Sequence, residues 1–315
     1  MNKTIKILLA VFAVLIALYF LFFRSSEKVS TEKIDAKLFV ADSSKIDKIE
    51  IVKNSETIVL EKVNNQWKLT KPIDYPADTT NIYMMLSDLK NFTLESVASE
   101  NPAKFNGYLD SVNNAKITTY QEGKPLGTFI LGKTQANDNS YIKKPEENRI
   151  LLASNLTAAL FTKTSKDFRN KFMFAIPTFA VSSVSFKSTD SNNVDMTVSK
   201  SGENKWVIGS DSVSSSVMEG FLNILANFNT DDFKDTVMTT FPVPVYTVTV
   251  NTTSGQPTVI NLYKEPVTDP NGVPSYITQV SGNNQLFKLF GALATQLMKK
   301  RSDFIPQAPK PPPGK

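Results

Sequence analysis

The same order of short motifs occurs twice along the chain, with the second copy 132 to 139 residues after the first. Trp67-Lys68-Leu69 corresponds to Trp206-Val207-Ile208, and these two runs hold the only two tryptophans of the sequence. A repeat of this kind indicates one supersecondary unit built twice, so we expect two similar domains. The other pairs are Ile49-Glu50-Ile51 with Val184-Ser185-Phe186, Asn91-Phe92 with Asn227-Phe228, Gly123-Lys124-Pro125 with Gly255-Gln256-Pro257, Ser140-Tyr141-Ile142 with Ser275-Tyr276-Ile277, and Asp167-Phe168 with Asp303-Phe304.

Each repeat combines several strand patterns with few helical ones. After Asp78, four apolar residues recur at the spacing of one helix face, which predicts a helix beginning there. They are Ile82, Met85, Leu86 and Leu89. Strands separated by short turns around a single helix are typical of an α+β fold with a mostly antiparallel sheet. The predicted strands of the first repeat comprise residues 49–51, 57–61, 67–69, 116–120, 126–131, 141–143 and 150–152.

Two further helical patterns complete the repeats. Residues 156–171 predict a helical stretch that closes the first repeat, and Asp211 heads a predicted helix in the second. The apolar residues of that second helix are Val217, Phe221, Leu225 and Phe228. We therefore expect the first α+β repeat at 38–175 and the second at 176–305, each carrying one or two packed helices.

The N-terminal region predicts a membrane anchor. Ile7 to Phe23 is a run of 17 apolar residues between Lys6 and Arg24. A helix of this length spans roughly 25 Å, which nearly matches a bilayer core. Because Leu21-Phe22-Phe23-Arg24 is a poor peptidase site, we expect an uncleaved signal anchor at 1–28 and a stalk at 29–37; a cleaved signal peptide is the alternative. This predicts a single-pass protein of the cytoplasmic membrane, with its bulk in the periplasm.

The charge is concentrated at the two ends of the sequence. The formal net charge is +5; residues 1–28 contribute +3 and residues 306–315 contribute +2, which leaves 29–305 neutral. A neutral body predicts no nucleic-acid partner, because that affinity comes mainly from clustered phosphate-neutralising charge. Residues 306–315 hold five prolines and two lysines and predict a disordered, polyproline-like tail.

Cysteine and histidine are both absent from the sequence. This excludes disulfides, thiol nucleophiles, Cys/His zinc sites and catalytic triads that contain histidine. The clustered acids Asp231, Asp232 and Asp235 predict a solvated loop after the second helix. We therefore expect no catalytic residue, no metal site and no cofactor.

One run matches a nucleotide-binding pattern letter for letter. Gly127 to Thr134 reads GTFILGKT, which fits the phosphate-binding loop consensus. That chemistry requires a flexible loop followed at once by a helix, whereas Thr-Phe-Ile-Leu favours a strand and a turn-forming run follows. We therefore predict a strand here and no nucleotide.

The equivalent tryptophans are the candidate binding residues. Trp67 and Trp206 occupy matching positions in the two repeats. Buried aromatic residues at such positions are usually core or sheet-packing anchors, and stacking against a ligand is the alternative function.

Several motifs in order resemble a known bacterial family. They are Trp67-Lys68-Leu69 with Pro72, Ala77-Asp78 before the first helix, Leu131-Gly132, Tyr141-Ile142-Lys143 and Asp167-Phe168-Arg169-Asn170-Lys171. Together with the anchor, this order resembles domain of unknown function 4340. The chain departs from the family's pattern at Asn106-Gly107-Tyr108-Leu109. The resemblance implies a protein associated with ABC transporters like those of gliding-motility systems, and it carries over no catalytic residue.

These observations predict a non-enzymatic, membrane-anchored extracytoplasmic protein, an accessory or scaffold subunit of an ABC-type envelope transport assembly. The span at 7–23 would contact transporter subunits, and the repeats would bind a partner or cargo. Two alternatives stay open: a membrane-tethered hydrolase of envelope polymers that uses Asp or Glu, and a stand-alone envelope adhesion module.

Overall fold

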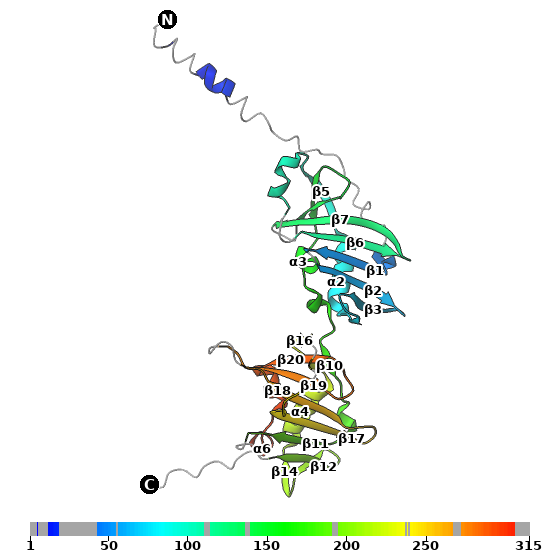
Figure 1. The fold of residues 1–315 in the computed structure, drawn as a ribbon, viewed down its shortest axis with the longest axis vertical. Coiled ribbons are helices and arrows are strands. Elements are labelled where there is room, and N and C mark those ends of the chain that lie inside the picture. The colour runs from blue at the N-terminus through cyan, green and yellow to red at the C-terminus, as the bar shows by residue number, and fades with distance from the viewer. Residues whose placement is uncertain are drawn as a thin grey trace. The chain divides into compact units, whose positions relative to one another are not determined.

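The computed structural model describes residues 5, 12–18, 43–54, 56–109, 114–135, 139–190, 195–236, 238, 240–266 and 272–305. The chain divides into two compact units, Met1–Asn170 and Lys171–Lys315. Each unit contains an antiparallel sheet of nine described strands and one main helix (Figure 1). The predicted α+β class with two mostly antiparallel sheet domains is therefore confirmed.

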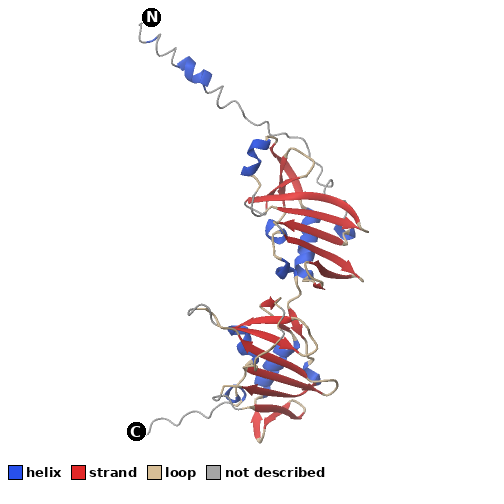
Figure 2. Ribbon diagram, viewed as in Figure 1, coloured by secondary structure: helices blue, strands red, loops and turns tan. Residues whose placement is uncertain are grey.

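The first unit has the sheet order β4-β3-β2-β1-β6-β7-β8-β9-β5. The helix α2 (Thr79–Asn91) connects β4 at one edge of this sheet to β5 at the other edge. It lies against the sheet, so the chain crosses the whole unit once (Figure 2). The strands are β1 (Lys48–Lys53), β2 (Glu56–Val63), β3 (Gln66–Lys71), β4 (Tyr75–Pro76), β5 (Thr93–Ser99), β6 (Ala115–Gln121), β7 (Lys124–Gln135), β8 (Asn139–Lys143) and β9 (Ile150–Ser154).

The second unit repeats this topology strand for strand, in the order β14-β13-β12-β11-β17-β18-β19-β20-β16. Its crossing helix is α4 (Ser215–Ala226), and a small extra pair joins β10 (Phe172–Phe174) to β15 (Phe228–Asn229). The identical order shows that the repeated motifs reflect a repeated fold. The strands are β11 (Val181–Ser188), β12 (Met196–Gly202), β13 (Lys205–Ile208), β14 (Asp211–Val213), β16 (Asp232–Lys234), β17 (Tyr246–Thr252), β18 (Thr258–Lys264), β19 (Ser275–Val280) and β20 (Leu286–Phe290).

The two crossing helices form for sequence-encoded reasons. Helix α2 is capped by the Asp78 carboxylate, which accepts a hydrogen bond from the Thr80 amide at 2.9 Å. Its buried face consists of Ile82, Met85 and Leu89. Each such side chain contributes about 1.5–3 kcal/mol when it is fully buried. Helix α4 buries Met218, Phe221, Leu222 and Leu225 in the same way.

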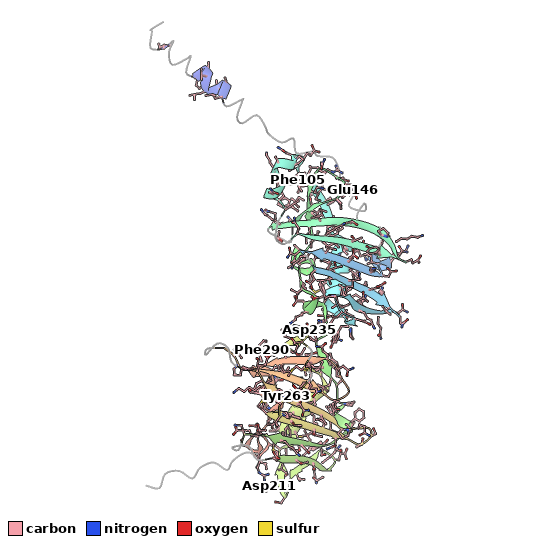
Figure 3. All side chains as sticks on the ribbon, viewed as in Figure 1. Phe105, Glu146, Asp211, Asp235, Tyr263 and Phe290 are labelled. Atoms are coloured by element: carbon pink, nitrogen blue, oxygen red, sulfur yellow. The ribbon has the colours of Figure 1, made fainter. Side chains whose placement is uncertain are left out.

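Both predicted ends of the second helix are wrong. The helix ends at Ala226, and Phe228, which was predicted to belong to it, lies in β15. Asp211, labelled in Figure 3, lies in the edge strand β14, where it pairs with Ile208, and α4 begins only after Ser214. The strand forms because Asp211–Val213 extends the β12–β13 hairpin as a third strand before the chain turns into the helix. Val217 accordingly lies on the exposed side of α4.

The predicted helical stretch 156–171 is interrupted. It contains two short segments, α3 (Ala158–Phe161) and the 3-10 turn η4 (Ser165–Phe168). Thr164 separates them because its amide and hydroxyl both bond to the Asp167 carboxylate, at 2.9 and 2.7 Å, and so start a new turn. Threonine competes with the helix backbone in this way more readily than most residues.

A closing segment ends each unit. In the first, the Asp78 amide donates to the Phe168 carbonyl at 2.8 Å, and the Asn170 amide donates to the Pro76 carbonyl at 2.9 Å. In the second, α5 (Gly291–Leu297) and α6 (Arg301–Phe304) close the unit, and the Phe304 ring packs 5.7 Å from the Phe221 ring. Each closing segment therefore ties the end of its repeat to the crossing helix.

The predicted anchor lies mostly outside the described residues. Within the run 7–23, residues 12–18 are described and are helical. No helix in the described part of the chain is long and apolar enough to cross a membrane. The stalk at 29–37 and the tail at 306–315 also lie outside the described residues.

Candidate functional site

The second unit contains a groove of about 480 Å³ beside Trp206. Three elements form its walls: the β12–β13 hairpin, the 3-10 turn η5 (Thr178–Ala180) and one flank of α4. A hollow of this size is large enough for a peptide segment or a small molecule. The lining residues are Thr178, Phe179, Lys200, Glu203, Asn204, Trp206, Ser215, Glu219, Leu222 and Asn223.

The groove has an apolar floor and one exposed aromatic residue. Trp206 and Leu222 are 4% and 6% exposed and form the floor, whereas Phe179 is 81% exposed. Aromatic rings are usually placed where part of their surface is covered. Burial of such a ring contributes about 1.5–3 kcal/mol. Phe179 is therefore the residue of this groove that gains most when a ligand covers it.

Two hydrogen bonds hold the walls of the groove in position. The Ile176 amide donates to the Leu225 carbonyl at 3.0 Å, which fixes the start of the η5 segment to α4. On the other wall, the Ser215 hydroxyl donates to the Asn204 carbonyl at 2.9 Å and ties the hairpin turn to the first turn of α4. The walls are thus positioned by the fold itself, so a ligand need not order them.

The charges of the groove favour a ligand with a positive group. Glu203 and Glu219 are acidic, and Lys200 is the single base among the lining residues, which gives a net charge of −1. Asn204 and Asn223 add side-chain amides that can donate and accept hydrogen bonds. The groove can therefore bind a partly apolar group next to a cationic one.

Trp67 occupies a different environment in the first unit. It is 4% exposed and belongs to the main hydrophobic core, and its indole N–H has no hydrogen-bond partner among the described residues. The Lys62 ammonium lies 5.4 Å from the centre of its ring. On the matching helix, Tyr83 and Met84 are 60% and 50% exposed. Trp67 is therefore a packing residue of the core, whereas Trp206 lies in the floor of a groove.

The phosphate-loop pattern lies on a strand. Residues 127–134 form the middle of β7, which pairs with β6 on one side and β8 on the other. The strand prediction is confirmed. Gly132 allows a close backbone approach, because a Cβ there would lie 2.6 Å from the Tyr108 carbonyl oxygen. The Lys133 ammonium donates to the Asn106 and Gly107 carbonyls at 3.2 and 3.0 Å.

The clustered acids of the second unit have structural contacts. Asp231 accepts a hydrogen bond from the Phe290 amide at 2.8 Å, and Asp232 lies in the edge strand β16 rather than in a loop. Asp235 lies beyond this strand (Figure 3). In the described part of the chain, no three acidic side chains are arranged to hold a metal ion.

The second unit also contains a partly buried ion cluster that the sequence did not reveal. Glu265 is 13% exposed and contacts the ammonium groups of Lys288 and Lys234 at 2.9 and 3.1 Å. It also accepts a hydrogen bond from the Ser275 hydroxyl at 2.8 Å. Burial acts to raise the pKa of Glu265, but these three hydrogen bonds outweigh it and lower the pKa to about 2. The members lie on β16, β19 and β20 and just after β18, so no local sequence pattern reveals the cluster.

Residues 67–247 match the family model described as Domain of unknown function (DUF4340). The match covers more than half of the chain, and the chain therefore belongs to this family, as its motif order predicts. No curated protein and no solved structure matches it. The description of the family names no activity.

Proposed function

We propose that this chain is a non-enzymatic, membrane-anchored extracytoplasmic binding protein, which serves as an accessory or scaffold subunit of an ABC-type envelope transport assembly. The observation that carries the proposal is the run Ile7 to Phe23, with 17 apolar residues between Lys6 and Arg24. A segment of this kind fixes a protein to one membrane face and gives it a surface for other membrane subunits.

The groove of the second unit supports binding as the role of the body. Its walls are fixed by hydrogen bonds, and Phe179 presents most of its ring to solvent. A preorganised groove with one exposed aromatic anchor is typical of sites that bind a protein segment. In this proposal the span contacts the transporter subunits, and the groove contacts a partner or cargo.

In-cell crosslinking with the full-length protein tests the proposal. The crosslinked protein is extracted in detergent and captured, and its partners are identified by mass spectrometry. The matched control replaces residues 1–28 by a cleavable signal and so keeps the body without the span. We expect ABC-type transporter subunits with the anchored form and not with the control.

A second pair of variants distinguishes partners that bind through the groove from partners that bind through the span. Phe179→Ala removes the exposed ring, and Val243→Ala, at a residue that is 75% exposed elsewhere in the second unit, is its control. We expect Phe179→Ala to lose a captured partner that Val243→Ala keeps, while the transporter subunits remain with both. Capture of the same proteins with and without residues 1–28 would count against the membrane-subunit role.

A further inference from the structure

We infer that a hollow in the first unit binds a phosphate group, which is held between the ammonium groups of Lys53 and Lys133. The hollow has a volume of about 350 Å³ and lies between the end of β1, the end of β7 and the short helix α3. This site is separate from the groove beside Trp206. The inference does not depend on the proposed transport role.

The register of the sheet brings the two lysines to the same hollow. Lys53 is the last residue of β1 and pairs with Ala115 of β6, which pairs in turn with Leu131 of β7. Lys133 follows two residues later on β7. Since neighbouring strands lie about 5 Å apart, β1 and β7 are about 10 Å apart across β6. Ala115 carries only a methyl group between them, so two long side chains can reach one ligand from opposite sides.

Main-chain carbonyls hold both ammonium groups, and no described carboxylate neutralises either of them. The Lys53 ammonium donates to the Thr162 carbonyl at 2.5 Å, and the Lys133 ammonium donates to the carbonyls of Asn106 and Gly107. Neither lysine forms an ion pair with a described residue, and the lining of the hollow contains no acid. An ammonium group has three donors, so Lys53 retains two and Lys133 retains one. Two uncompensated positive charges at one hollow favour an anionic ligand.

The close approach at Gly132 fixes the position of Lys133. A Cβ at residue 132 would lie 2.6 Å from the Tyr108 carbonyl oxygen, so glycine allows the turn that ends at Tyr108 to pack against β7. The Lys133 amide donates to that same carbonyl at 2.8 Å. This contact brings the Asn106 and Gly107 carbonyls within reach of the Lys133 ammonium. The lysine is therefore positioned before a ligand arrives, which lowers the entropy cost of binding.

The donors of the hollow fit a phosphate group better than a carboxylate. Besides the two ammonium groups, Thr134 brings a side-chain hydroxyl that can donate a hydrogen bond. A phosphate offers acceptor oxygens in several directions, which suits donors that come from different strands. Residues 127–131 are paired with β6, so the site does not use the amide cradle of a nucleotide-binding loop. Recognition depends instead on the side chains of Lys53, Lys133 and Thr134.

Isothermal titration calorimetry on the full-length chain in a non-ionic detergent tests the site. The titrants are inorganic phosphate and glycerol phosphate, which is a soluble equivalent of a phospholipid headgroup. Acetate at the same ionic strength is the comparison anion. We expect both phosphates to bind, and acetate to bind at least about tenfold more weakly. Tighter binding of glycerol phosphate would indicate a lipid headgroup as the source of the ligand, and tighter binding of inorganic phosphate would indicate the free ion.

Lysine variants test which groups hold the phosphate. Lys53→Gln and Lys133→Gln should each weaken phosphate binding about tenfold, because each removes a charge-assisted hydrogen bond. Lys124→Gln is the matched control, since it removes the same charge from the opposite end of β7. It should change the affinity by less than about twofold, because salt screens a charge at that distance.

A second pair of variants keeps the test decisive where a lysine variant fails to fold. Ala159 is exposed and lines the hollow. Ala159→Asp adds a carboxylate that competes with the ligand for the ammonium groups, whereas Ala159→Asn has the same shape without the charge. We expect phosphate binding to be lost with the first and kept with the second. The inference would be overturned if phosphate did not bind the unmodified chain, if acetate bound equally well, or if the Asp and Asn variants behaved alike.

Discussion

The ion cluster of Glu265 gives a quantitative stability prediction. The pKa of this carboxyl falls from an ordinary value of 4.5 to about 2 in the folded protein. One pKa unit corresponds to about 1.4 kcal/mol, so the shift amounts to about 3 kcal/mol of folding free energy above pH 5. Since Lys234 and Lys288 are partly exposed, at 32% and 27%, solvent screening reduces this to about 2 kcal/mol.

The sign of the pH dependence follows from the direction of the shift. A lowered folded-state pKa stabilises the protein when the carboxyl is ionised in both states, which is above the ordinary value of 4.5. That contribution is lost as the pH falls from about 4.5 toward 2. The variant Glu265→Gln removes the charge at every pH. We therefore expect it to lower the unfolding free energy of the second unit by about 2 kcal/mol at pH 7 and by much less at pH 2.5.

Tryptophan fluorescence can report on the second unit alone. In a Trp67→Phe background, Trp206 is the single tryptophan, and it belongs to the same unit as Glu265. Urea unfolding of this background with and without Glu265→Gln, at pH 7 and pH 2.5, gives the two differences. Glu147→Gln, which removes the partner of Lys144 and Arg149 in the first unit, is the control and should not move the Trp206 transition. An equal loss of stability at both pH values would refute the electrostatic reasoning.

Three further predictions follow from the packing. Gly132→Ala places a Cβ 2.6 Å from the Tyr108 carbonyl oxygen and should destabilise the first unit by at least about 1 kcal/mol. Urea unfolding followed by Trp67 fluorescence in a Trp206→Phe background measures this loss, and an unchanged unfolding midpoint would contradict the prediction. Phe304→Ala removes a fully buried ring and should lower the unfolding free energy of the second unit by about 3–5 kcal/mol, measured by urea unfolding. A loss below about 1 kcal/mol would show that the closing segment is dispensable for stability. Phe179→Ala should change that unfolding free energy by less than about 0.5 kcal/mol, because the ring is 81% exposed, and a larger loss would mean that Phe179 supports the fold.

The strands and the start of the first helix could be predicted because each depends on the pattern of a few neighbouring residues. The repeated order of motifs then predicted two similar domains. The alternating runs and the cap at Asp78 are visible in the sequence, and the structure confirms both. The edge strand at Asp211 was missed because a three-residue strand is stabilised by its hairpin partner rather than by its own pattern. The interrupted stretch 156–171 was missed because its threonines bond locally instead of continuing a helix.

The candidate site was only partly visible in the sequence. Trp206 was singled out by its repeated position, but nothing local distinguished it from Trp67 in the core. The groove depends on η5, the β12–β13 hairpin and α4, which come together only in the folded unit. An exposed phenylalanine at 179 has no sequence signature, because exposure is a property of the packed structure.

We propose above that residues 1–28 anchor the chain and that it serves as a subunit of a membrane transport assembly. Crosslinking in intact cells, with the full-length protein beside the form whose residues 1–28 are replaced by a cleavable signal, tests it most directly. We expect ABC-type transporter subunits to be captured only by the protein that keeps residues 1–28. Failure to capture any membrane partner above the control form would contradict it.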